Sequence, residues 1–158
     1  MTDVFSPAYR SALMSRIRGK GSLSTELAVA EILRAAGLTG WRRNIRINWR
    51  LSSLPASLRS RQIGGRFRGY ATPDFVFNAI RVVLFVDGCF WHCCPKHGTI
   101  PSSNVDYWQS KLMRNRHRDR FVDAALCDRG WTVLRVWEHE LKDKDRLIRW
   151  LSRHLDPE

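Results

Sequence analysis

The sequence RVVLFVDG at residues 81–88 decides the fold class of this chain. Its β-branched and aromatic residues follow one another without alternating with polar ones, which is typical of a strand covered on both faces. A related run, PDFVF, precedes it at residues 73–77, and a third, TVLRVW, follows at residues 132–137. We therefore predict three strands of one sheet that is buried between helices.

Helical patterns surround these strands. Ser6 and Pro7 resemble a cap and a first-turn proline of a short helix that ends near Gly19. A second helix should follow the cap Ser24, carry Glu26 in its first turn and stop at Gly37. Two further helices are predicted at residues 108–126, closed by Gly130, and at residues 141–155. This order implies an α/β domain with a mixed sheet between helices, and the length of 158 residues favours a single domain over residues 1–158.

The composition points to a polyanionic partner. The chain has 27 Lys and Arg against 15 Asp and Glu, a formal net charge of +12 at pH 7. Residues 41–70 carry eight Arg and no acid, and residues 111–120 carry five bases against Asp119 alone. An anionic membrane surface is the competing partner, but neither segment has the wide apolar face of an interfacial helix. A basic surface that only aids solubility is the other alternative.

The sequence offers no route into or across a membrane. It has no apolar run of about 18 residues, and its N-terminus lacks the apolar core of a secretion signal. We therefore expect a cytoplasmic, nucleoid-associated protein with no membrane partner.

Residues 45–70 form an Arg-rich insertion that also contains four Ser, three Gly and one Pro. No helix or strand is predicted for the longer stretch at residues 38–70 that contains it. The insertion could extend the contact with phosphates or be an unordered loop, and we favour phosphate contact.

Two carboxylates mark the ends of neighbouring strands. Asp74 starts one predicted strand and Asp87 ends the next, so a hairpin would bring both to the same edge of the sheet. One or two carboxylates are what Mg²⁺ requires from a protein when water and phosphate supply the other ligands. Aspartate is also common at strand ends for turn formation, so the pair alone is weak support for a metal.

A second cluster of ligand types follows directly. Cys89, Cys94 and His97 form a Cx4CxxH array, which suits structural zinc. Cys93 lies beside Cys94 and makes the choice between them ambiguous. Buried free cysteines can also pack as small apolar residues.

The fourth zinc ligand must come from elsewhere in the chain. His139 is the first candidate, because it follows the strand at residues 132–137, which can return beside the strand that ends at Val86. Cys127 is the second candidate. Four protein ligands would make the zinc structural.

Large aromatic residues flank the basic helix. Phe90 and Trp91 lie in the loop with the cysteines, and Trp108 begins the helix. Such rings can stack on bases or insert between them, at least cost beside a mismatch, although most tryptophans simply fill the core. Expected DNA contacts on the helix itself are Lys111, Arg114 and Arg118.

Several blocks together resemble the very short patch repair (Vsr) endonuclease family. They are the segment at residues 10–20 with Glu26, PDFVF at 73–77, FVDGCFWH at 85–92, Tyr107-Trp108, and GWTVLRVWEH at 130–139. The resemblance covers residues 10–141 apart from about 45–70, and the GCFWH element followed by clustered ligands is its most specific part.

This resemblance implies a restriction-endonuclease-like three-layer α/β/α domain with a structural zinc site. The activity implied is a Mg²⁺-dependent nick in double-stranded DNA on the 5′ side of the thymine in a T:G mismatch, the product of 5-methylcytosine deamination. By position, Asp74 would bind Mg²⁺, Glu26 would be the N-terminal acidic residue, and His92 would activate water. The implied aromatic wedge is Phe90, Trp91 and Trp108, and the zinc positions are Cys89, Cys94, His97 and His139.

The sequence departs from the family at two places. Some members have histidine where Asp87 stands, so a role for Asp87 in binding a second Mg²⁺ is our own inference. Cys89 occupies the position two residues after Asp87, where many related nucleases have lysine. His92 must therefore share the role of that lysine as a base or a charge-stabilising group. The insertion at 45–70 is the other departure.

Two alternatives remain. One is a related restriction-type or phage nuclease with another target, and the other is a non-catalytic, zinc-stapled DNA-binding protein. A monomer is expected, because a T:G mismatch lacks two-fold symmetry and one nick needs one active site.

Overall fold

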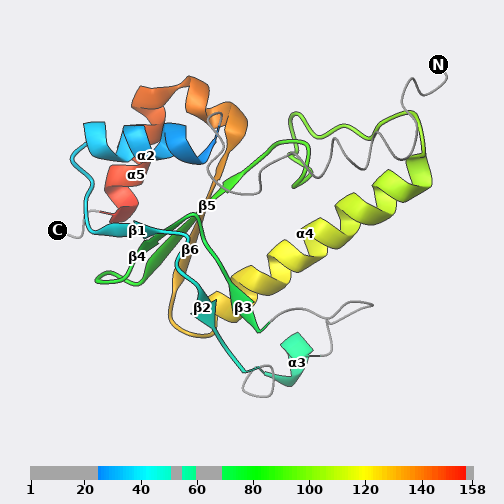
Figure 1. The fold of residues 1–158 in the computed structure, drawn as a ribbon, viewed down its shortest axis with the longest axis horizontal. Helices are drawn as coiled ribbons and strands as arrows, with labels where there is room; N and C mark the ends of the chain where they lie inside the picture. Colours follow the sequence, from blue (N-terminus) through cyan, green and yellow to red (C-terminus); the bar gives the residue numbers. More distant parts are fainter. Residues whose placement is uncertain (1–24, 51–54, 60–68, 156–158) are drawn as a thin grey trace.

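The computed structural model describes residues 25–50, 55–59 and 69–155 (Figure 1). The expected helix at residues 6–19 and the proposed cap Ser24 lie outside these ranges. None of the helices within them is both long and apolar enough to cross a membrane.

A four-stranded mixed sheet forms the centre of the fold, in the order β1-β4-β5-β6. Its strands are β1 (Trp41–Arg43), β4 (Phe75–Phe77), β5 (Val82–Asp87) and β6 (Thr132–Trp137). The first three pair antiparallel, whereas β6 pairs parallel to β5 from Val82↔Thr132 to Asp87↔Trp137. All three strands expected from the sequence are confirmed, and the parallel pair brings the ends of β5 and β6 together.

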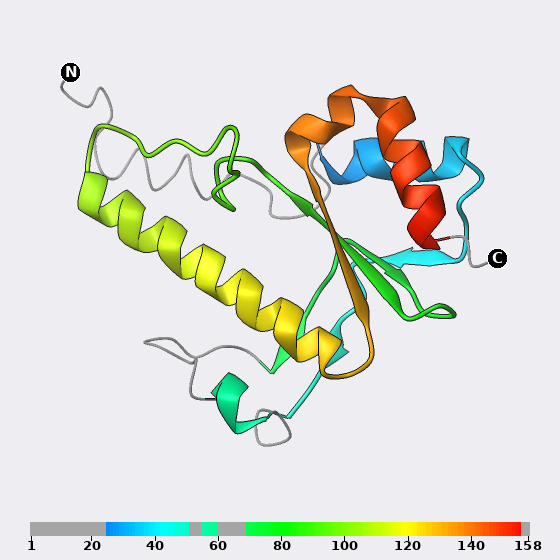
Figure 2. The same ribbon diagram turned by 180° about the vertical axis from the view of Figure 1, so that it is seen from behind.

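Helices cover both faces of this sheet (Figures 1 and 2). On one face α2 (Glu26–Ala35) and α5 (Lys144–Leu155) bury residues such as Leu33 and Leu151 against β4 and β5. On the other face α4 (Val105–Cys127) packs Phe121, Ala125 and Leu126 against Val76 and Val83. Because β5 meets a helix layer on both sides, its apolar run is continuous.

Short strands and a short helix occupy the stretch at residues 38–70 for which no element was predicted. They are β1, the two-stranded ribbon of β2 (Ile47–Asn48) and β3 (Tyr70–Ala71), and the short helix α3 (Ala56–Arg59). Strands of two or three residues are too short to show a period, and β1 exists because its backbone pairs with β4. Residues 51–54 and 60–68 of the Arg-rich insertion lie outside the described ranges.

Two helix boundaries differ from the expectation. The helix after β6 begins at Lys144 rather than at residue 141, because a 3₁₀ turn, η2 (Glu138–Lys142), comes first. Asp143 lies directly before α5, and its carboxylate caps the first turn by accepting the Arg146 backbone N–H at 3.1 Å. Helix α4 begins at Val105, three residues before the expected Trp108.

Candidate active site and metal cluster

Asp74 and Asp87 lie at the same edge of the sheet, as the hairpin predicted. Asp74 directly precedes β4, and Asp87 is the last residue of the neighbouring β5. The Asp74 carboxylate reaches across the hairpin and accepts the backbone N–H of Val86 at 2.7 Å. This bond fixes Asp74 beside the end of β5.

Asp74 is the most strongly perturbed carboxyl of this edge. Burial raises its pKa from 3.8 to about 6, and the negative charges of Glu26 and Asp87 act in the same direction. The Val86 hydrogen bond and His92 oppose the rise. These mutual effects place Asp74, Glu26, Asp87 and His92 in one electrostatic neighbourhood. An ionised, buried carboxylate of this kind favours a bound cation.

His92 comes from the loop after β5 and is held by a residue that the sequence reasoning missed. Its Nδ1 lies 2.6 Å from Asp119 Oδ2 on α4 and 3.5 Å from Asp87 Oδ1. Burial would raise the pKa of Asp119, but the hydrogen bond and charge of His92 lower it overall. An ionised Asp119 accepts a hydrogen bond from the Nδ1–H of the ring, and this tautomer leaves Nε2 without a proton and able to accept one. The available signal was that Asp119 is the lone acid among the five bases of residues 111–120.

The other two acids of the neighbourhood are paired with arginines. Glu26, in the first turn of α2, accepts a bond from Arg43 of β1 at 2.7 Å. Asp87 receives Arg135 Nη1 at 2.8 Å on both of its oxygens. Neither arginine stood out in the sequence, because each is one of many in this basic chain.

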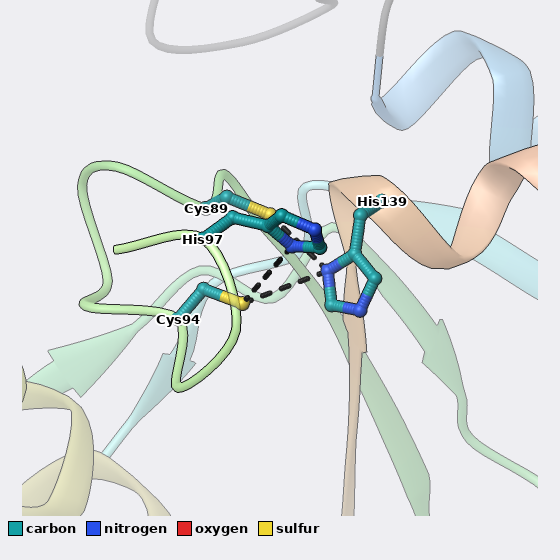
Figure 3. A group of neighbouring side chains, drawn as sticks. All are labelled: Cys89, Cys94, His97 and His139. Carbon is teal, nitrogen blue, oxygen red and sulfur yellow. Dashed lines mark hydrogen bonds between the residues drawn. The ribbon is translucent and has the colours of Figure 1, made fainter. Parts of the chain in front are cut away.

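The four expected zinc ligands converge (Figure 3). One ligand atom from each of Cys89, Cys94, His97 and His139 lies within 4.8 Å of all the others. His139 Nδ1 is 3.3 Å from Cys89 Sγ and 3.6 Å from Cys94 Sγ, and Cys94 Sγ is 3.8 Å from His97 Nδ1. A tetrahedral zinc with ordinary bond lengths needs ligand atoms about 3.3–3.8 Å apart. The three separations between neighbouring ligand atoms lie in this range, so the two thiols and two imidazoles could hold a metal ion.

The alternative ligands lie elsewhere. Cys127 is exposed at the end of α4, and the Cys93 thiol points to the backbone oxygen of Leu112 at 3.7 Å. Gly98 closes the loop, donating its N–H to Cys94 O at 2.7 Å, and a Cβ there would lie only 2.6 Å from that oxygen. The cluster joins this loop to η2, so the residues flanking His92 are tied to the end of β6.

The aromatic candidates form one cluster beside the loop. The rings of Phe90, Trp91 and Trp108 have centroids 4.9–6.1 Å apart. Trp108 is only 7% exposed, whereas Phe90 and Trp91 are half-buried. Lys111 Nζ lies 5.2 Å from the ring centres of both Trp91 and Trp108.

The remaining expected DNA contacts lie further along α4. Arg114 is exposed, and Arg118 is exposed with one guanidinium nitrogen 3.3 Å from Asp119. The basic face of α4 therefore continues to Asp119, which is bonded to His92.

Comparison with known proteins shows the family of this chain. The family model described as DNA mismatch endonuclease Vsr matches residues 44–97, which include Asp74, Asp87 and His92. The type II nicking enzyme V.XorIIP of Xanthomonas oryzae is 38% identical over 160 residues, covering 99% of both chains. This chain belongs to the Vsr endonuclease family.

Other relatives extend the comparison. This Vsr-family chain is 46% identical over 131 residues to the type II nicking enzyme V.NaeI of Lentzea aerocolonigenes, covering 74% of this chain and 79% of the relative. It is 38% identical over 79 residues to the DNA mismatch endonuclease Vsr of Escherichia coli, covering 48% and 49%. Membership of the Vsr family makes the chain a DNA endonuclease with a central mixed sheet.

Proposed function

We propose that this protein nicks double-stranded DNA on the 5′ side of the thymine in T:G mismatches and so initiates very short patch repair in the cytoplasm, at the nucleoid. The observation that carries the proposal is the neighbourhood of Asp74 and the His92–Asp119 pair at one edge of the sheet. A carboxylate able to bind a cation, beside a histidine whose Nε2 has no partner among the described residues, can hydrolyse a phosphodiester by metal-assisted general base catalysis. The restriction-endonuclease-like form of the domain is part of the same proposal.

The proposed chemistry divides between these residues. Asp74 would hold Mg²⁺, which when bound supplies Lewis-acid stabilisation of the scissile phosphate and the leaving oxygen. His92 accepts a proton from water at Nε2 and directs that water in line with the bond to be cut. Asp119 holds Nδ1 at 2.6 Å and stabilises the imidazolium that forms.

The proposed DNA contacts surround this centre. Phe90 and Trp91 would insert beside the mismatched pair, with Trp108 packed behind them. Lys111, Arg114 and Arg118 would contact the phosphates along α4. Zinc in the cysteine–histidine cluster would fix the loop that carries both the wedge and His92, so the base and the distorted pair keep a constant relation. One such site per monomer is enough for a single nick.

A second candidate target requires a direct comparison because five relatives carry the name of type II nicking enzymes. A nuclease of the same family that recognises another site would share the hydrolytic residues but differ in which duplex it cuts. Substrate preference therefore separates the two candidates.

The test is a nicking assay on end-labelled duplexes that contain T:G, another mismatch or only paired bases, each with and without Mg²⁺. We expect a Mg²⁺-dependent nick in the thymine strand of the T:G duplex, and loss of nicking but retained binding in Asp74→Ala. The matched control is Asp128→Ala, an exposed acid beyond α4. Equal cutting of all duplexes would reject mismatch specificity, and full cleavage by Asp74→Ala would reject the assignment of Asp74.

A further inference from the structure

Arg135 lies between two carboxylates that come from different layers of the fold. From the middle of β6 its Nη1 reaches both oxygens of Asp87 at 2.8 Å. Its Nε and Nη2 contact the carboxylate of Asp123 on α4 at 3.1 and 2.7 Å. The guanidinium carbon also lies 4.6 Å from the ring centre of Phe85. Arg135 therefore joins the end of β5 to α4 through a planar, doubly paired contact.

Arg135 engages both carboxylate oxygens of Asp87. The Asp87 side chain is only 5% exposed, and among the described residues its one other polar contact is His92 Nδ1, 3.5 Å from Oδ1. A divalent cation at Asp87 would stand next to a guanidinium that already contacts both oxygens. Burial would lower the pKa of Arg135, but its bonds to Asp123 and Asp87 raise the pKa overall, so the side chain stays cationic. Two cations on one buried carboxylate repel each other at short range.

Asp74 has the opposite surroundings. Within the described part of the chain, Glu26 is paired with Arg43 and Asp119 with His92 and Arg118, whereas Asp74 is bonded to the N–H of Val86. Asp74 is thus the carboxylate of this edge whose charge no basic side chain contacts in the described ranges.

We propose that Arg135 is a positioning residue that holds Asp87 beside His92 and keeps it from coordinating the divalent cation, so that Asp74 is the only carboxylate ligand of the hydrolytic site. The sequence alone predicts Asp87 as a magnesium ligand, and this proposal gives it a different task. This assignment deepens the proposed function. It rests on that function only in taking the site to hydrolyse DNA. Arg135 itself does not touch the substrate.

The test measures cation binding separately from catalysis. Mn²⁺ is titrated into the zinc-loaded protein and the free ion is followed by electron paramagnetic resonance, for Asp74→Asn, Asp87→Asn, Arg135→Met and the double variant Asp87→Asn/Arg135→Met. Arg149→Met is the matched control, since Arg149 is exposed on α5. Asp74→Asn should weaken Mn²⁺ binding by about ten-fold or more, whereas Asp87→Asn should change it by less than about three-fold.

Removing the guanidinium should free Asp87 for the cation. Arg135→Met is expected to gain at least about three-fold in Mn²⁺ affinity or to bind a second ion, and the double variant should lose that gain. In nicking assays Arg135→Met and Asp87→Asn should lower kcat by about ten-fold without raising the Mg²⁺ concentration needed for half-maximal rate. Arg135→Lys, which keeps one cationic donor, should recover part of kcat.

Two results would overturn the proposal. One is a loss of Mn²⁺ affinity in Asp87→Asn as large as that in Asp74→Asn, and the other is unchanged Mn²⁺ binding in Arg135→Met. If Arg135→Met fails to fold, because it leaves Asp87 buried without its cation, Asp87→Asn and the neutral double variant still decide the question. A wild-type protein that ignores T:G duplexes would refute the proposed function alone, because the Mn²⁺ measurements do not depend on the DNA target.

Discussion

Asp74→Asn should make the protein more stable at neutral pH while it abolishes nicking. The wild-type carboxyl has a folded-state pKa of about 6 against 3.8 in the unfolded chain, chiefly because it is buried. Ionisation is therefore harder in the folded protein, and wild-type stability falls as pH rises through this interval. Asparagine carries no charge, and its carbonyl oxygen can still accept the Val86 N–H.

The magnitude follows from the shift. A difference of about two pKa units at roughly 1.4 kcal/mol per unit amounts to about 3 kcal/mol at pH 8, where the Asp74 carboxyl is ionised in both the folded and the unfolded wild type. About half of this gain should remain at pH 5, and none below pH 3.8. For a domain of this size the gain at pH 8 corresponds to a rise in Tm of about 6–12 °C.

Urea unfolding of the two proteins at pH 8 and pH 5 measures the difference. Mg²⁺ is omitted rather than chelated, so that the chelator does not remove the metal proposed for the cysteine–histidine cluster. Added Mg²⁺ should then stabilise the wild type but not Asp74→Asn, because only the wild type binds it at this carboxylate. Asp128→Asn, at an exposed position, should change the free energy of unfolding by less than about 0.5 kcal/mol. Equal stability of wild type and Asp74→Asn at pH 8 would refute the argument that a buried, unpaired charge is held at this edge.

Three further changes test the other parts of the site. Asp119→Asn should lower kcat by about 100-fold or more while duplex affinity stays the same, because the ring of His92 loses the acceptor at Nδ1; a normal single-turnover rate would contradict the pair. Cys94→Ser should remove the bound zinc found by elemental analysis and lower Tm, whereas Cys127→Ser, outside the cluster, should keep both; full zinc content in Cys94→Ser would exclude this cluster as the site. Trp91→Ala should reduce the preference for T:G over paired duplex by about ten-fold, the loss of one stacking contact, and unchanged discrimination would count against the wedge.

Part of the candidate site could be predicted because its residues are close in sequence. Cys89, Cys94 and His97 lie on one short loop, so their spacing alone indicated a metal site. Asp74 and Asp87 flank two strands joined by a tight turn, and a hairpin of that length has few ways to pair. Their shared edge of the sheet followed from local geometry.

The remaining residues of the site could not be predicted, because they are brought together by packing between layers. Asp119 meets His92, and Asp123 meets Arg135, only because α4 lies across the sheet at one particular rotation. Arg43 reaches Glu26 through a three-residue strand that has no period of its own.

The sequence by itself determined the buried strands, the basic character of the surface and the loop that carries three of the four metal ligands. The strands and the loop follow from residue types over fewer than about ten positions, the range over which hydrophobic period and ligand spacing act. The basic surface follows from the net charge of the whole chain. Only the tertiary structure decided that His139 rather than Cys127 completes the cluster, since the parallel pairing of β5 with β6 brings their ends together while α4 carries Cys127 away. It also decided which carboxylates are already paired, because the partner of a buried charge is the cation that packing places within a few ångströms of it.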